Sequence, residues 1–133
     1  MLLILWKNRN PLLFLLAWLL HLSALGQDPY LLGVARLQEG SYDQARNHFE
    51  QVLAADSDDP GGLLKIAETY YLTADYQTAI EYLGKLEVQR VGMGSYLLAK
   101  SYARLGDATT AMHYLEKHLR SEYKLPSSTI LLN

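Results

Sequence analysis

Three aspartates lie close together near the middle of the chain, Asp56, Asp58 and Asp59. Clustered carboxylates are typical calcium ligands, and an EF-hand loop would continue them with an acid or amide at the fifth position and a glutamate at the twelfth. Counted from Asp56, the fifth position is Pro60 and the twelfth is Ala67, so the calcium pattern is not met. The stretch instead predicts a solvated turn before a helix that begins near Pro60, where negative charge complements the helix dipole.

Histidines are the other residues that could bind a metal or move a proton. His113 and His118 are five residues apart, so on one helix their side chains point about 140° away from each other. His48 is expected at an exposed position beside Phe49. No Ser/His/Asp arrangement, glycine-rich phosphate loop or spaced pair of carboxylates stands out. The sequence therefore predicts no enzyme, no metal site and no cofactor.

Length and composition describe a single folded domain. The chain has 133 residues, of which 50% are hydrophobic and 20% are charged. It contains no cysteine, which excludes a disulfide framework, a thiolate zinc site and a cysteine nucleophile. The formal net charge of −2 has the wrong sign for a nucleic-acid-binding surface, which requires a clustered basic face.

Residues 1–26 have the layout of a secretory signal peptide. Lys7 and Arg9 precede an apolar run over residues 12–25, and small residues stand just before Gln27. This run is short for a helix that crosses the bilayer, which needs roughly 20 apolar residues. We therefore expect export to the periplasm or beyond, with a mature chain that begins at Gln27. An uncleaved membrane anchor over residues 12–25 and a buried helix are the alternatives.

Three internal repeats follow the leader, over residues 31–53, 64–87 and 97–119. Each repeat has a small residue, then a turn residue seven positions later, an alanine five later and a bulky apolar residue four later. In chain order these residues are Gly33, Gly40, Ala45 and Phe49, then Ala67, Ala74, Ala79 and Leu83, then Ala99, Gly106, Ala111 and Leu115. Such agreement at four positions is typical of a repeat architecture.

Apolar residues recur within each repeat at steps of three and four, which predicts amphipathic helices. The turn residues at 40, 74 and 106 divide each repeat into two helices. The small residues are expected to let the two helix backbones approach closely, with Phe49, Leu83 and Leu115 filling the space beneath them. One hairpin has too small a core to be stable alone, so the hairpins must stack on one another.

This pattern resembles the tetratricopeptide repeat family, over about residues 26–122. The resemblance implies an all-α fold, a right-handed α-solenoid of three hairpins over about 26–59, 60–91 and 92–125. Arg36, Ala108 and His118 depart from the family pattern, and the second repeat is two residues short, leaving through RVGMGS rather than an Asp-Pro turn. Residues 123–133 are expected to begin a continuation.

In this family the first helix of each repeat lines a concave face that binds a protein or peptide. The resemblance places these residues on that face: Tyr30, Val34, Gln38, Leu64, Glu68, Tyr71, Leu72, Tyr96, Lys100 and Arg104. Alternatively, Leu64, Leu72 and Tyr96 pack on the adjacent repeat while the two cations are solvated. The family's carboxylate clamp is absent, since Tyr30, Val34, Lys65, Met93 and Leu97 occupy the clamp positions.

Two functions fit these features. The first is an exported scaffold that binds a protein or peptide partner, with no nucleic acid and with membrane contact only through an uncleaved leader. The second is an amino-terminal regulatory or targeting module of a longer envelope enzyme or signalling protein. The apolar residues Ile130, Leu131 and Leu132 motivate the second function, because solenoids usually shield their last hairpin with a polar face. The partner and the oligomeric state are not indicated.

Overall fold

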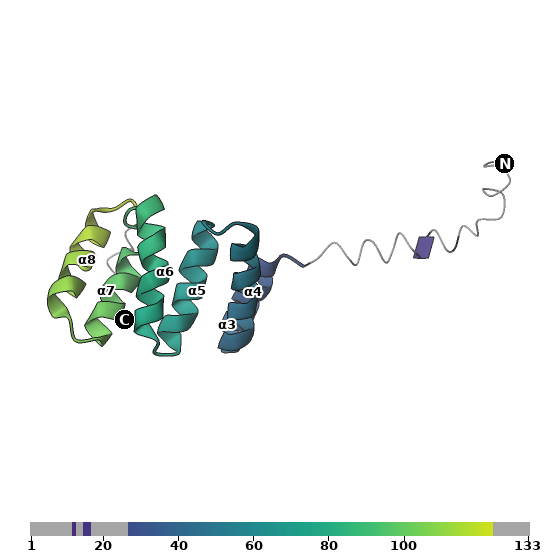
Figure 1. The fold of residues 1–133 in the computed structure, drawn as a ribbon, viewed down its shortest axis with the longest axis horizontal. Coiled ribbons are helices and arrows are strands. Elements are labelled where there is room, and N and C mark those ends of the chain that lie inside the picture. The colour runs from purple at the N-terminus through teal and green to yellow at the C-terminus, as the bar shows by residue number, and fades with distance from the viewer. Residues whose placement is uncertain (1–11, 13–14, 17–26, 124–133) are drawn as a thin grey trace.

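The computed structural model describes residues 12, 15–16 and 27–123. Within residues 27–123 the chain forms six helices and no strand: α3 (Pro29–Gln38), α4 (Tyr42–Ala55), α5 (Pro60–Leu72), α6 (Tyr76–Gln89), α7 (Ser95–Arg104) and α8 (Ala108–Arg120). They pair in chain order into hairpins α3–α4, α5–α6 and α7–α8, which stack in one row (Figure 1). The expected all-α solenoid of three helical hairpins is confirmed.

Each hairpin turns at one residue in the left-handed backbone region. Gly40 and Gly106 have φ angles of +76° and +85°, and Ala74 has +64°. In all three turns the amide of the following residue donates to the carbonyl five positions before it, at 2.9–3.0 Å. The three turns that the repeat alignment predicted therefore share the same backbone conformation and hydrogen bond. Ala74 adopts this conformation at a steric cost that glycine avoids.

Small residues bring the two helices of a hairpin into contact. A Cβ atom on Gly33 would lie only 2.5 Å from Cε1 of Phe49, whose side chain is completely buried. The alanines early in the next helices, Ala45 and Ala79, are also completely buried. The predicted close approach is confirmed, and Phe49 fills the core of the first hairpin as expected.

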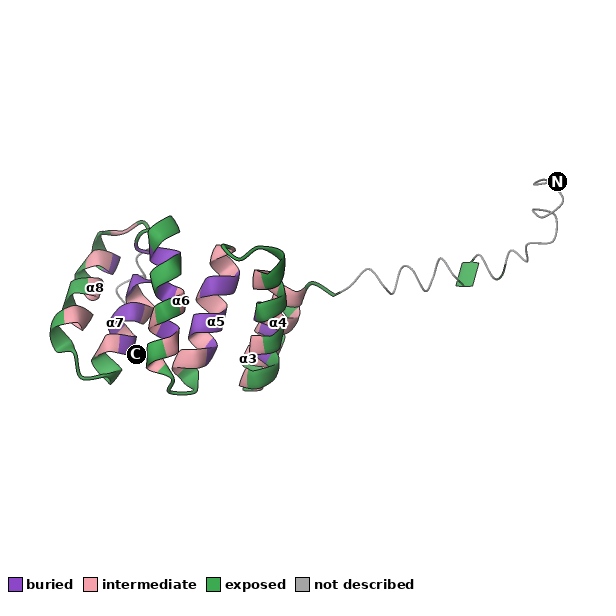
Figure 2. Ribbon diagram, in the orientation of Figure 1, coloured by how far each residue is buried: buried purple, intermediate pink, exposed green. Residues whose placement is uncertain are grey.

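The middle hairpin, α5–α6, supplies most of the fully buried apolar side chains (Figure 2). They are Leu63, Ile66, Ala67, Ala79, Leu83 and Leu86. One core cluster joins this hairpin to Leu98 of α7, and the other joins it to Phe49 of α4. The core of each outer hairpin is thus completed by its neighbour, as expected of a stacked repeat.

The last hairpin is less well covered than the first two. Ala111 and Leu115 of α8 stand where Ala79 and Leu83 stand in α6, yet they are only half-buried. In the first two hairpins, the first helix of the following hairpin packs over the equivalent positions. The open side of α7–α8 therefore keeps apolar surface that a further helix would cover.

The first joint between hairpins is made by the clustered aspartates. The carboxylate of Asp59 caps α5 by accepting a hydrogen bond from the amide of Gly62 at 2.6 Å. Asp56 accepts from the amide of Asp58 at 3.1 Å, and Pro60 opens α5. The predicted turn and helix start are confirmed. Among the described residues, no three His, Asp or Glu side chains are placed to hold a metal ion.

The second joint, residues 91–94, is held by a buried carboxylate. Glu87 of α6 accepts hydrogen bonds from the amides of Gly92 at 3.0 Å and Gly94 at 2.8 Å, and its Oε2 lies 2.7 Å from Nζ of Lys117. Burial, the largest single influence, acts to raise the pKa of Glu87, but the bonds from Lys117, Gly92 and Gly94 together outweigh it. The pKa of Glu87 is therefore lowered, and the carboxylate stays ionised. A single side chain thus links α6, the joint and α8.

The expected leader at residues 1–26 lies outside the described residues except for residues 12, 15 and 16, and so does the terminal segment from residue 124 onward. Among the described residues, no helix combines the length and the apolar character needed to span a membrane.

Candidate peptide-binding groove

A hollow of about 470 Å³, called the groove below, lies between the first helices of the second and third hairpins. It is lined by Leu64, Glu68, Tyr71 and Leu72 of α5, by Met93, by Tyr96, Leu97 and Lys100 of α7, by His118 of α8, and by Tyr123. Most of this lining is apolar or aromatic with a few charged groups, which is the usual character of a binding pocket.

The floor of the groove is an extension of the hydrophobic core. Leu64, Met93 and Leu97 are half-buried and pack against the cluster that contains Leu83 and Leu98. The core cluster therefore supports one side of each of these side chains, while another part of each faces the hollow. Leu72 at the rim is 45% exposed. The groove therefore offers a fixed apolar floor to an incoming side chain.

Two tyrosine rings hold the ammonium group of Lys100. Its Nζ atom lies 5.1 Å from the centroid of the Tyr71 ring and 5.5 Å from that of the Tyr96 ring. Both distances allow cation–π attraction. Tyr96 also contacts the buried ring of His118, at 5.3 Å between centroids. These contacts restrain Lys100 on the groove wall.

Arg104 extends the same wall by one helical turn. It lies four residues after Lys100, so both side chains are on one face of α7. Its Nε atom donates a long hydrogen bond of 3.4 Å to the hydroxyl of Tyr71. This bond raises the pKa of Arg104 above its ordinary value, so the guanidinium stays charged. Tyr71 thus contacts both cations.

The charges in and around the groove are not balanced. Its one carboxylate, Glu68, is paired within α5 with Lys65, at 2.7 Å from Nζ to Oε2. Neither Lys100 nor Arg104 forms an ion pair with any carboxylate in the described part of the chain. The groove therefore presents a positive edge beside an apolar floor.

The repeated hairpins agree with known protein families. Two models described as tetratricopeptide repeat match the chain, one over residues 36–90 and the other over residues 95–120. The chain belongs to the tetratricopeptide repeat family. Its fold is that of a protein-interaction scaffold. A comparison with curated proteins gives no significant match.

Solved structures with this fold include two of MamA. One is 26% identical, has a TM-score of 0.60, and the match covers 66% of this chain and 53% of that chain. The other, labelled AMB-1, is 17% identical with a TM-score of 0.63, and the match covers 79% of this chain and 58% of that chain. The second likeness shows the fold alone. The tetratricopeptide chain described here spans a little over half the length of these MamA chains.

The structure brings most of the predicted tetratricopeptide groove residues together. Those that line the groove are Leu64, Glu68, Tyr71, Leu72, Tyr96 and Lys100, and Arg104 joins them through Tyr71. Part of the alternative also agrees with the structure, since Leu64 packs against the core cluster that contains Leu98 of the next hairpin and Arg104 is exposed to solvent. Lys100, by contrast, lies over two tyrosine rings. The role of the two cations in binding a partner stays a prediction.

Tyr30 and Val34 lie elsewhere. The Tyr30 ring meets Phe49 edge-on at 6.0 Å between centroids, and a Cβ atom on Gly61 would lie 3.0 Å from it. Val34 packs against the same cluster as Phe49. Both side chains therefore fill the space among α3, α4 and α5. Gly61 is the sequence signal for the position of Tyr30, because a residue without a side chain leaves space that the Tyr30 ring can occupy.

Four groove residues were not among those predicted: Met93, Leu97, His118 and Tyr123. Met93 and Leu97 stand at positions where the family's carboxylate clamp is missing. His118, which the sequence did not place at the groove, is 2% exposed and contacts the ring of Tyr96. His48, expected at the surface, is half-buried. Apolar residues at clamp positions are the signal that could have revealed the floor.

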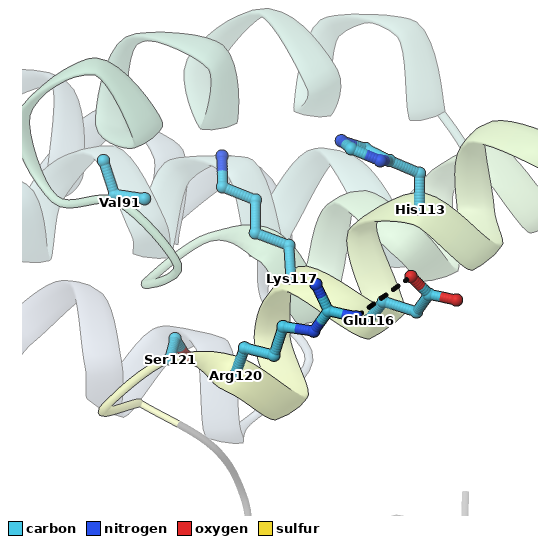
Figure 3. A pocket seen from close by; sticks show the side chains of 6 residues that line it. All are labelled: Val91, His113, Glu116, Lys117, Arg120 and Ser121. Atoms are coloured by element: carbon cyan, nitrogen blue, oxygen red, sulfur yellow. Dashed lines mark ion pairs between the residues drawn. The ribbon is translucent and has the colours of Figure 1, made fainter.

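A second hollow, of about 330 Å³, lies beside the second joint and is shown in Figure 3. Its lining includes His113, Lys117 and Arg120, all from α8. Lys117 is paired with Glu87, and Arg120 lies 3.9 Å from Glu116, so these charges are already matched. His113 faces this hollow while His118 faces the groove, which confirms that the two histidines point in different directions.

Proposed function

We propose that the chain is an exported scaffold that holds a protein partner by binding one of its segments in the groove. The observation that carries the proposal is the groove itself, with its apolar floor beside two cations that no described carboxylate neutralises. Apolar contacts supply affinity, and unmatched charges select and orient the segment. The scaffold fold of the tetratricopeptide repeat supports binding rather than catalysis.

Site-directed cross-linking in the native cell tests the groove assignment. A photoreactive benzoylphenylalanine replaces Leu72 at the groove rim in one variant, and Val88 of α6, which is 86% exposed and outside the groove, in a matched control. We expect a discrete cross-linked product from position 72 and none from position 88. Equal products from both positions, or none from position 72, would contradict binding in the groove.

Export is supported by the basic and apolar layout of residues 1–26. Mass spectrometry of the protein purified from its own cell measures where the mature chain begins. We expect a chain that starts at Gln27. A chain that still starts at Met1 and sediments with membranes would instead indicate an anchor over residues 12–25.

A second candidate is that the repeats form the amino-terminal regulatory or targeting module of a longer envelope enzyme or signalling protein. The half-buried Ala111 and Leu115 favour it, because equivalent residues in the earlier hairpins are covered by the next helix. The gene sequence beyond the codon for Asn133 tests this candidate. An open reading frame with a further domain is the expected result, and a stop codon there would contradict it.

A further inference from the structure

The groove's charge and spacing point to the chemistry of its occupant. We propose that it selects an extended peptide segment in which a carboxylate and a bulky apolar side chain are separated by one residue. This inference rests on the proposed function, since it names the class of segment that the scaffold holds.

The requirement for a carboxylate comes from the charge pairs of the described residues. Five of the seven other cations in this part of the chain have an acidic partner close by: Arg36 with Glu39, Arg46 with Asp43, Lys65 with Glu68, Lys117 with Glu87, and Arg120 with Glu116. The other two, Lys85 and Arg90, are exposed to solvent. Lys100 and Arg104 have only tyrosines. Lys100 is also half-buried, so it has lost part of its hydration. A carboxylate would supply the charged acceptor that neither of these two cations has among the described residues.

The two cations are held in place before any ligand arrives. Tyr71 and Tyr96 restrain the ammonium group of Lys100, and the Tyr71 hydroxyl accepts from Arg104. A free lysine or arginine loses side-chain entropy when it binds an anion, which weakens the net interaction. Since part of that ordering is already present here, above all for the half-buried Lys100, an anion that binds at this edge costs less side-chain entropy than it would with two free cations.

The spacing follows from the geometry of α7. Leu97, Lys100 and Arg104 lie along one face, and a helix rises 1.5 Å per residue, so the cations lie about 4.5 and 10.5 Å beyond the floor residue. In an extended peptide, side chains on the same side are two residues, or about 6.6 Å, apart. A carboxylate two residues from an apolar side chain therefore reaches the cations while the apolar group rests on Leu97. Adjacent residues would point to opposite sides.

Synthetic peptides test the proposal by fluorescence polarisation with the full chain. The probe is a fluorescein-labelled peptide with the core Asp-Ala-Leu between flexible Gly-Ser arms. Matched peptides carry Asn-Ala-Leu, which removes the charge, Asp-Ala-Ala, which removes the apolar group, and Asp-Leu-Ala, which makes the two groups adjacent. We expect the first peptide to bind about tenfold more tightly than each of the other three, which corresponds to about 1.4 kcal/mol.

Protein variants locate the effect. Lys100→Gln should reduce affinity for the Asp-Ala-Leu peptide about tenfold and leave affinity for the Asn-Ala-Leu peptide unchanged, because only the charge contact is lost. Lys85→Gln is the matched control, since Lys85 of α6 also lies over a tyrosine ring, that of Tyr82, at 5.4 Å but outside the groove. It should leave both affinities unchanged.

The outcomes separate this inference from the proposed function. Equal binding of the Asp and Asn peptides, or equal effects of Lys100→Gln and Lys85→Gln, would overturn the inference. If cross-linking from position 72 still yielded a partner, the scaffold function would stand and only the occupant's chemistry would be wrong. If neither cross-linking nor any peptide reported binding, the proposed function would fail with it.

Discussion

Replacing the buried carboxylate of Glu87 by an amide should loosen the last hairpin. Glu87→Gln keeps the shape of the side chain but removes its charge. That charge accepts hydrogen bonds from the amides of Gly92 and Gly94 and pairs with Lys117. Hydrogen bonds to charged groups contribute roughly 1.5–3 kcal/mol and neutral ones roughly 0.5–1.5 kcal/mol, so each retained bond weakens by about 1 kcal/mol. Lys117 is 32% exposed and regains water, which limits its own penalty. We expect a total loss of about 2–3 kcal/mol.

Thermal unfolding followed by circular dichroism at neutral pH measures this loss. For a domain of this size, 1 kcal/mol shifts the midpoint by roughly 4–8 °C, so Glu87→Gln should melt at least about 8 °C below the natural protein. Glu116→Gln is the matched control, because Glu116 pairs with Arg120 only at 3.9 Å and both side chains are largely exposed. Such surface pairs contribute at most about 1 kcal/mol, so its midpoint should change little.

The pH dependence gives a second, independent reading of the same side chain. The folded pKa of Glu87 lies below its ordinary value, so its stabilising effect is fully present above the unfolded value, near 4.3 for glutamate, and is lost as the pH falls through the folded pKa. The stability difference between the natural protein and Glu87→Gln should therefore shrink below about pH 4.3. Equal melting of Glu87→Gln and Glu116→Gln, or a constant difference across this range, would refute the role of the Glu87 carboxylate in holding the second joint and α8.

Four further substitutions test the hairpins themselves by chemical denaturation. Gly33→Ala should lower the free energy of unfolding by about 1–3 kcal/mol because the added methyl group meets Phe49. Gly84→Ala, where an added Cβ atom would have nothing within 4 Å, should instead stabilise α6 by up to about 1 kcal/mol. Equal effects of the two substitutions would contradict the packing argument. Ala74→Gly should stabilise the turn by up to about 1 kcal/mol because its φ angle is +64°, and destabilisation would show that the turn is not strained. Ser41→Asp should add about 0.5–1 kcal/mol by supplying the helix cap that Ser41 does not make, and an unchanged midpoint would contradict it.

The repeat spacing predicted the hairpins well because it reports on local geometry. Gly33 and Phe49 are sixteen residues apart, and their contact follows from two helices joined by one turn at Gly40. The joint at residues 91–94 could not be predicted in the same way. The sequence showed that an Asp-Pro turn is missing, but not that Glu87 reaches back to hold the shorter joint. That depends on how α6 and α8 meet.

The groove shows the same limit. The family resemblance placed Tyr71, Lys100 and Arg104 on the concave face, and the structure brings them together. The same resemblance placed Tyr30 on that face, which is wrong, because its ring occupies the space beside Gly61 in the next hairpin. Nor could the resemblance assign Tyr123, which reaches the groove only because of the course that the chain takes after α8. Positions set by contacts between hairpins were the ones that the sequence did not predict.

The concentration of buried side chains in α5–α6 has a kinetic consequence. This hairpin contributes fully buried side chains to both core clusters, whereas α3–α4 and α7–α8 each contribute them to one. Almost all helix–helix contacts join elements adjacent in the chain, so little loop entropy opposes their formation. We therefore expect α5–α6 to form the folding nucleus, with the outer hairpins adding in either order. Substitutions at Leu83 should slow folding, while substitutions at Ala111 should mainly accelerate unfolding.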